Sequence, residues 1–267
     1  MATALDREWD RLGRPARFSV IDAGAGPGTL ARGIHAAAPR CLASLDYVCV
    51  ELSEAQRVSH PEWVTSRADM PAGRITGVVL ANELLDNLPF APARRMAGAI
   101  RSARVTLTGE RLEPWWDDSE QHAETFVAQD AAGAWLLDAV ELVEAGRVII
   151  IDYCRENSAD VEIRTYARHA RAGEPLEGLG TKDITVDVDL AQLQQRVRPA
   201  RSIRSQAEWL HDHGLDDLVD AGRAAWEAGA DMGDLAALKG RSRVREAEAL
   251  TDPDGLGGFT VAEWVID

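Results

Sequence analysis

The 267-residue sequence lacks any apolar run that approaches the roughly 20 residues needed to span a bilayer. Its first dozen residues carry three acids and lack the apolar centre of a secretory signal peptide. It has only three cysteines, which are widely spaced, and this excludes a disulfide scaffold and favours reduced thiols in the core: Cys41, Cys49 and Cys154. The sequence therefore predicts a cytoplasmic protein that does not insert into a membrane.

Positive charge is also scarce in this chain. The sequence has 29 Lys and Arg residues against 44 Asp and Glu residues, which gives a net charge of −15. Because this charge repels the phosphate backbone, a nucleic acid partner is not expected. An acidic surface suits a cationic partner instead, such as an arginine-bearing segment of a protein. The sequence leaves the oligomeric state open.

Apolar strands alternate with helical stretches in the first half of the chain. This alternation predicts an α/β fold with a mainly parallel sheet and helices on both of its faces. Ligands of such sheets bind at the carboxyl ends of the strands. The expected strands cover residues 18–22, 47–51, 63–66, 77–82 and 147–152.

The rest of the chain is expected to complete one domain spanning residues 1–267. Alternating apolar and polar residues at 91–118 predict a small antiparallel insertion. Residues 155–250 are expected to begin irregularly and to continue as three helices, the second of them broken at Gly214, forming a region that covers the substrate. The closing segment, 257–266, alternates like an edge strand.

Glycines occupy three alternate positions just after the first expected strand: Gly24, Gly26 and Gly28. Glycine lets the chain turn sharply and lets backbone N–H groups approach a ligand without a Cβ in the way. A dinucleotide fingerprint needs its third glycine where Thr29 stands, so an NAD-dependent oxidoreductase is a distant alternative. The spacing Asp-x-Gly-x-Gly-x-Gly instead resembles the loop that binds S-adenosylmethionine (SAM) in class I methyltransferases.

Three acidic residues near this loop are candidate cofactor ligands. Glu51 ends the next strand, 23 residues beyond Gly28, where it could accept hydrogen bonds from both ribose hydroxyls. Asp22 is expected to face the cationic methionyl end, because a carboxylate attracts an ammonium or sulfonium group. Asp69 stands where many such enzymes contact the adenine amine. The alternatives are a structural glycine turn with a solvated Glu51, an Asx turn at Asp22 and an ordinary loop acid at Asp69.

A longer signature lies at residues 81–90, where Asn82, Glu83, Asp86 and Pro89 form the pattern Asn-Glu-x-x-Asp-x-x-Pro. This pattern resembles the signature of the MidA-like family, which comprises the mitochondrial complex I assembly-factor methyltransferases and their bacterial relatives. Further matches to that family lie at residues 50–53, 151–153, 164–169, 182–185 and 205–210.

The resemblance implies a SAM-dependent protein methyltransferase whose acceptor is an arginine ω-nitrogen. A guanidinium is protonated and planar, so acidic groups are needed to orient it. Glu83 and Asp86 could provide this clamp, with Asn82 at the same strand end beside the cofactor. No metal ion or covalent intermediate is required. The alternative for Asn82 and Glu83 is capping of a following helix.

Four further residues are candidates for the acceptor site. Asp152 and Tyr153 follow the last parallel strand and could wall the acceptor pocket. Tyr166 and His169 lie in the expected substrate cover, and the alternative for His169 is a surface or capping role. The chain departs from the family pattern at Asp187, where the family commonly has His, and in its N-terminal region, where relatives carry a Gly-Asp-Phe-x-Thr motif.

Two other classes of function stay open at this stage. A small-molecule or RNA methyltransferase would use the same cofactor with a different acceptor. A non-catalytic assembly or interaction protein would keep the fold and transfer no methyl group.

Overall fold

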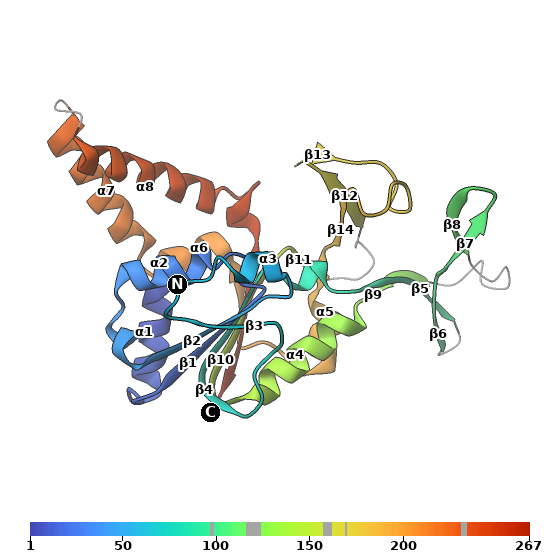
Figure 1. Cartoon of the computed structure of the whole chain (residues 1–267), viewed down its shortest axis with the longest axis horizontal. Helices are drawn as coiled ribbons and strands as arrows, with labels where there is room; N and C mark the ends of the chain where they lie inside the picture. The colour runs from blue at the N-terminus through green and yellow to red at the C-terminus, as the bar shows by residue number, and fades with distance from the viewer. Residues whose placement is uncertain (97–98, 116–123, 157–161, 169, 231–233) are drawn as a thin grey trace. The chain divides into compact units, whose positions relative to one another are not determined.

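The computed structural model describes the chain except for residues 97–98, 116–123, 157–161, 169 and 231–233. The described residues form two compact units (Figure 1). One, called the core unit here, comprises Met1–Asn82, Val140–Ile151 and Ala200–Asp267. The other, called the inserted unit, comprises Glu83–Ala139 and Asp152–Pro199.

The core unit is built on one large sheet. Its strands are β1 (Phe18–Ala23), β2 (Leu45–Val50), β3 (Thr65–Arg67), β4 (Ile75–Asn82), β10 (Val143–Asp152), β16 (Ser202–Ser205) and β17 (Thr260–Ile266). They lie in the order β16-β17-β10-β4-β1-β2-β3. The neighbours from β10 to β3 pair in parallel, whereas β16 and β17 pair in antiparallel fashion. This mainly parallel sheet confirms the predicted α/β fold class.

The helices of the core unit come from both ends of the chain. They are α1 (Ala2–Arg11), α2 (Thr29–Ala37), α3 (Glu54–Arg57), α6 (Gln206–Asp212), α7 (Leu215–Gly229) and α8 (Leu235–Thr251), with the 3₁₀ helices η1 (Arg40–Ser44) and η6 (Leu256–Gly258). Gly214, with φ +88°, separates α6 from α7, as the sequence predicted. None of the described helices is long and apolar enough to cross a membrane.

Apolar side chains from α1, α2 and α6 join the sheet in one buried cluster. Leu5 of α1, Ile34 of α2 and Trp209 of α6 belong to this cluster together with Val20 of β1 and Leu80 of β4. Burial of one such side chain contributes roughly 1.5–3 kcal/mol to stability. The packing therefore fixes the two central strands whose carboxyl ends carry the candidate cofactor residues.

The prediction that the closing segment forms an edge strand was wrong. β17 lies inside the sheet, and β16 forms the edge on that side. In an alternating edge strand, the charged side chain of Glu263 would face solvent. In the structure it is only 2% exposed. Its carboxylate pairs with Arg147 at 2.6 Å and with Arg204 at 3.1 Å. The buried charge is therefore compensated by two arginines and not by water.

The inserted unit contains small sheets and two helices. Its sheets comprise β5 (Ala91–Met96) between β6 (Ala99–Ser102) and β9 (Glu124–Ala128), β7 (Arg104–Thr108) with β8 (Arg111–Trp115), β12 (Ile163–Ala167) between β13 (Ala170–Arg171) and β14 (Asp183–Val186), and β11 (Cys154–Arg155) with β15 (Val188–Asp189). The helices are α4 (Asp130–Leu142), whose last turn belongs to the core unit, and α5 (Leu190–Arg196), and a 3₁₀ turn, η2, covers Leu85–Asn87.

Two features of the inserted unit differ from the sequence expectation. The antiparallel strands expected at 91–118 continue to β9. The start of the 155–250 region, expected to be irregular, contains β12 and β14, which pair along Ile163–Tyr166. Its high charge masked this pairing, because Arg164 places its guanidinium in an ion pair with the buried Asp187 and not in water.

Candidate active site

The glycine loop joins β1 to α2 at the carboxyl edge of the core sheet. Gly24, Gly26 and Gly28 have φ values of +72°, +54° and +79°, in the left-handed region that side chains other than glycine rarely adopt. The backbone N–H groups of Gly24 and Ala25 donate to the carbonyl of Val50 at 2.9 and 3.0 Å. The end of β2 therefore holds the start of this loop in place.

Glu51 lies against the same loop, directly after β2. Its Oε2 accepts a hydrogen bond from the N–H of Gly26 at 3.0 Å, and its Oε1 accepts one from the N–H of Ser53 at 2.8 Å. Each carboxylate oxygen keeps a second lone pair that could accept a ligand hydroxyl. Ser53 in turn caps α3, so this short helix positions the carboxylate.

His60 braces the glycine loop from α3's side, which the sequence did not predict. Its Nε2 lies 2.8 Å from the carbonyl oxygen of Gly26, and its Nδ1 lies 2.8 Å from the hydroxyl of Ser66. Because a carbonyl only accepts hydrogen bonds, Nε2 carries the proton in this arrangement. A Cβ on Gly28 would lie 3.3 Å from the imidazole, so ring and loop are in close contact.

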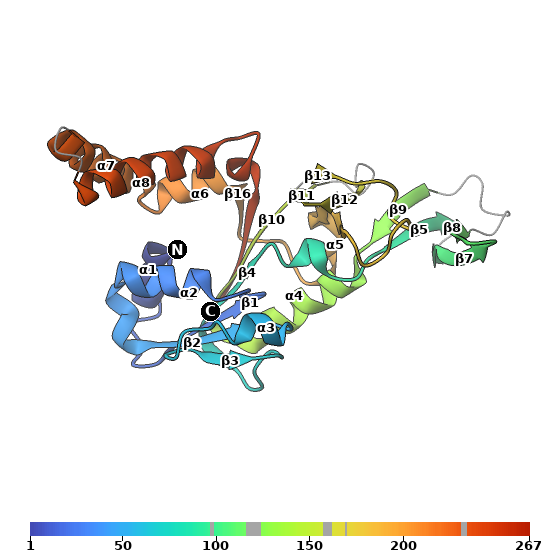
Figure 2. The ribbon, with the colours of Figure 1, turned by 45° about the horizontal axis from the view of Figure 1, so that its top comes forward.

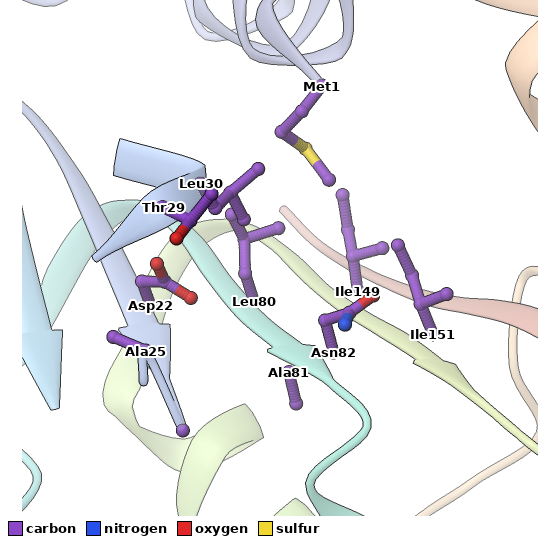
Figure 3. Close-up of a pocket in the computed structure, with 11 residues that line it drawn as sticks. Met1, Asp22, Ala25, Thr29, Leu30, Leu80, Ala81, Asn82, Ile149 and Ile151 are labelled. Atoms are coloured by element: carbon purple, nitrogen blue, oxygen red, sulfur yellow. The ribbon is translucent and has the colours of Figure 1, made fainter. Parts of the chain in front are cut away.

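A cavity of about 360 Å³ opens beside the glycine loop (Figure 3). Its volume falls within the roughly 300–1,000 Å³ typical of small-molecule sites. The walls are mainly apolar, with a few polar groups at the strand ends. They are formed by Met1, Asp22, Gly24, Ala25, Thr29, Leu30, Leu80, Ala81, Asn82, Ile149 and Ile151.

Asp22 places a buried carboxylate in this cavity (Figure 3). The side chain is 3% exposed, and its Oδ2 accepts a hydrogen bond from the hydroxyl of Tyr47 at 2.9 Å. Burial raises the pKa of Asp22 to about 6, although the Tyr47 hydrogen bond opposes the shift. Among the described residues no salt bridge reaches this carboxylate.

The predicted cofactor residues fall into three groups. Asp22, Gly24 and Asn82 line the cavity. Gly26, Gly28 and Glu51 form the neighbouring loop and its carboxylate support. Asp69 lines neither; its side chain is 78% exposed and pairs with Arg67 at 3.1 Å.

Two buried aspartates meet within the inserted unit. Asp152 is fully buried, and its Oδ2 accepts hydrogen bonds from the N–H groups of Leu85 at 2.9 Å and Asp86 at 3.4 Å. Asp86 is 6% exposed, and its Oδ2 accepts the hydroxyl of Thr185 at 2.8 Å. Both aspartates and the threonine come from family-like motifs that are distant in sequence.

Burial raises the pKa of both carboxyl groups in this pair. For Asp152 the second cause is repulsion from the charge on Asp86. For Asp86 the hydrogen bonds from Thr185 and from Asn87 oppose the shift. Two carboxyls in one buried site resist double ionisation, so the pair holds a proton more tightly than solvated aspartates do.

Glu83, Tyr153 and Tyr166 form the more open part of this region. Glu83 is exposed and has φ +50°, a strained conformation for a residue with a side chain. Tyr153 is 41% exposed, and burial, followed by the charges of Glu83 and Asp86, raises its pKa. Tyr166 also acts on Tyr153 electrostatically. His169, the fourth candidate, lies outside the described residues.

Asp187 stands where the family commonly has His, and it is buried here. Its Oδ2 accepts from Nε of Arg155 at 2.9 Å, and its Oδ1 accepts from Arg164. The Arg164 guanidinium lies 5.9 Å above the ring of Tyr153. The acid at this position therefore holds an arginine beside the predicted acceptor residues.

A family model described as "Putative S-adenosyl-L-methionine-dependent methyltransferase" matches residues 1–208 of the chain. The chain belongs to this methyltransferase family. The family agrees with the MidA-like resemblance that the motifs indicated. SAM is thus the cofactor of this methyltransferase.

Two solved structures from Burkholderia thailandensis resemble this methyltransferase. One, of an uncharacterized protein, has 22% identity and a TM-score of 0.78, with 100% of this chain and 79% of the other covered. The other, bound to S-adenosyl-homocysteine, has 22% identity and a TM-score of 0.76, with 100% and 76% covered. At this identity the similarity establishes the fold. No protein in a search of curated sequences matches the chain significantly.

The core unit of the methyltransferase fits SAM in two respects. The buried carboxylate of Asp22 has no salt-bridge partner among the described residues, and the methionyl end of SAM is cationic. Gly26 has φ +54°, and a Cβ there would lie 3.1 Å from Oε1 of Gln56, so a side chain is disfavoured at this position and the loop backbone stays uncovered by one. In the described part of the chain no group of His, Cys, Asp and Glu is arranged to hold a metal ion.

Proposed function

We propose that this methyltransferase transfers the methyl group of SAM to an arginine side chain of a partner protein. The main support is the combination of carboxylates and a tyrosine in the inserted unit: Glu83 and Asp86 both act on the half-exposed Tyr153. Carboxylates accept N–H bonds from a guanidinium, and aromatic faces stack on its plane. Glu83 directly follows Asn82, which lines the cofactor cavity.

On the cofactor side, Asp22 pairs with the cationic methionyl end, and the backbone of Gly24, Gly26 and Gly28 approaches the ligand. Glu51 accepts hydrogen bonds from the ribose hydroxyls through the lone pairs that Gly26 and Ser53 leave free. These assignments follow from the burial of Asp22 and from the contact between Glu51 and the loop.

Two further cofactor contacts complete this proposal. Asn82 contacts SAM from the end of β4, since it lines the same cavity as Asp22. Asp69 reaches the adenine amine from the loop after β3, where its exposed side chain pairs with Arg67. A surface ion pair of this kind is worth about 0–1 kcal/mol, so a ligand can displace it.

In the transfer step, SAM supplies an activated methyl group. This methyl group would pass to the ω-nitrogen, with S-adenosylhomocysteine as the leaving group and the displaced proton of that nitrogen released to water. Glu83 accepts guanidinium N–H bonds and so aligns the attacking nitrogen, while Tyr153 and Tyr166 flank the plane of the group. Alignment and charge stabilisation supply the rate in such a displacement.

The buried aspartates Asp86 and Asp152 support the proposed acceptor site by fixing the turn that follows Glu83. Asp152 accepts the N–H groups at the start of η2, and Asp86 is tied to β14 through Thr185. We assign Asp86 to the acidic clamp through this tie, because it fixes the turn that follows Glu83. Asp152 is fully buried, so we assign it to the acceptor site as a support that holds the same turn and does not line the pocket.

The test is the substitution Glu83→Gln, which keeps the size of the side chain and removes its charge. We expect calorimetric binding of S-adenosylhomocysteine to stay unchanged, while transfer of radiolabelled methyl groups to arginine in cell protein falls about a hundredfold or more. The control is Glu177→Gln, a neutralisation at another exposed glutamate of the inserted unit, which should leave both quantities unchanged.

Equal transfer by Glu83→Gln and the native enzyme would remove Glu83 from the mechanism. Transfer to a metabolite fraction with none to protein would replace the arginine acceptor by a small molecule. Absence of any transfer by an enzyme that binds the cofactor would favour an assembly or interaction protein.

A further inference from the structure

The two longest helices of the core unit form an antiparallel hairpin beyond the family-matched residues. Figures 1 and 2 show α7 and α8 running side by side. A Cβ on Gly240 would lie 2.5 Å from the carbonyl oxygen of Gly222, so the two backbones touch at this pair. Such close packing makes the hairpin a rigid platform for the side chains on its outer faces.

A groove of about 250 Å³ lies on this hairpin. In a chain with a net charge of −15, the groove is locally basic. Three arginines and one glutamate contribute to its walls, and a tryptophan and a valine provide apolar surface. The lining residues are Arg223, Trp226, Glu227, Arg241, Val244 and Arg245.

The arginines of the groove are largely without acidic partners. Arg223 pairs with Asp220 at 3.6 Å, a long and exposed contact. Within the described residues, no ion pair is formed by Arg241 or Arg245. These two are four residues apart on one helix face, where like charges repel. An anion placed between them would relieve this repulsion and accept several N–H bonds.

Apolar surface adjoins this positive charge. The guanidinium of Arg241 lies 5.1 Å from the centre of the Trp226 ring, and both side chains line the groove. Leu238 is three residues before Arg241 on the same face of α8 and is 50% exposed. A ligand that combines a carboxylate with an apolar side chain therefore matches the groove better than a bare anion.

We propose that this groove binds an acidic segment of a partner protein. A Glu or Asp side chain of that segment accepts bonds from Arg241 and Arg245, and a neighbouring apolar side chain packs on Trp226 and Val244. A nucleic acid fits less well, because Glu227 in the wall repels a backbone that carries a charge on every nucleotide, whereas a protein segment can offer a carboxylate to the arginines and an apolar side chain to Val244. The groove and the cofactor cavity share no residue, so this inference stands independently of the arginine acceptor.

The experiment titrates the full chain into a fluorescein-labelled peptide of glutamate and leucine residues and follows the fluorescence anisotropy. Two double variants remove the same charge from the same helix: R241A/R245A inside the groove and K239A/R243A outside it. We expect the groove variant to weaken binding about tenfold or more, since charge-assisted hydrogen bonds are lost. The control variant should change the Kd by less than about twofold. Binding of S-adenosylhomocysteine should stay the same in all three proteins.

Three results would overturn the proposal. The first is absence of peptide binding by the native chain at low salt. The second is equal weakening by the two double variants, which would reduce the effect to general charge attraction. The third is tighter binding of a single-stranded RNA oligonucleotide than of the peptide, lost in R241A/R245A, which would make the groove a nucleic acid site.

Discussion

At the scale of single residues, the charge on Asp22 is disfavoured by the fold in the absence of a cation. The carboxylate lies in a cavity with mainly apolar walls and accepts a hydrogen bond from the hydroxyl of Tyr47. Among the described residues, the other two buried acids of the core unit, Glu8 and Glu263, pair with arginines. In the proposed function the cationic methionyl end of SAM pairs with this carboxylate, so its burial costs stability only while the site is empty.

Because the buried carboxylate of Asp22 lowers stability when it is ionised, we expect the effect of Asp22→Asn on the Tm to depend on pH. The folded-state pKa is raised from 3.8 to about 6, so the unfolded state ionises first and the free energy of unfolding falls as the pH rises between these values. The loss reaches up to roughly 3 kcal/mol above pH 6. We expect Asp22→Asn to raise the Tm at pH 7.5, to raise it less at pH 4.5, and to weaken S-adenosylhomocysteine binding.

The measurement is thermal denaturation followed by circular dichroism at both pH values. Asp69→Asn is the control, because that carboxylate is 78% exposed and its neutralisation should not change the Tm with pH. An increase in Tm that is the same at pH 4.5 and 7.5 would show that burial of the charge is not the cause.

At the scale of elements, the glycine loop depends on neighbours that come later in the chain. His60, just after α3, bridges the Gly26 carbonyl and the Ser66 hydroxyl of β3. We expect His60→Ala to weaken S-adenosylhomocysteine binding about tenfold, because loss of one hydrogen bond and its packing loosens the loop. Calorimetry checks this, with His211→Ala as the control at an exposed histidine. Unchanged affinity in His60→Ala would mean that the loop is fixed without the imidazole.

The sequence predicted best those helices and strands whose position depends on a single factor, such as the burial of an apolar run. The strands at 18–22 and 77–82 are apolar runs buried in a parallel sheet, so their composition was sufficient. α4 was missed because apolar residues occur all round Asp130–Leu142 and leave no single stripe. β17 was predicted at an edge because its charged Glu263 suggested a solvent-facing side. The arginines that pair with Glu263 lie on β10 and β16, and the local sequence around β17 gives no sign of them.

The candidate site divides in the same way. Asp22, Gly24 and Asn82 could be located in one cavity from sequence, because strand ends of a parallel sheet collect at one edge. The supporting residues could not. Thr185 donates a hydrogen bond to Asp86, which lies 99 positions away in the sequence. His60 is an isolated histidine outside any motif, so its contact with the glycine loop could not be predicted.

At the scale of the whole molecule, the chain passes from the core unit to the inserted unit at residues that are candidates for the cofactor and acceptor sites. It leaves the core unit between Asn82 and Glu83 and again between Ile151 and Asp152. Asn82 and Ile151 are register partners on β4 and β10, so both exits lie at one edge of the sheet. The cavity beside the glycine loop, which is the proposed cofactor site, thus belongs to the core unit, and the acidic and aromatic candidates for the acceptor belong to the inserted unit.

The central claim is that the glycine loop of the core unit binds SAM, and calorimetric titration with S-adenosylhomocysteine tests it most directly. Gly26→Val adds a side chain where φ is +54° and a Cβ would meet Gln56, whereas Gly33→Val adds the same side chain at a position of α2 with open space. We expect saturable binding by the native chain and by Gly33→Val and none by Gly26→Val. Absence of binding by the folded native chain, or full affinity in Gly26→Val, would contradict the account.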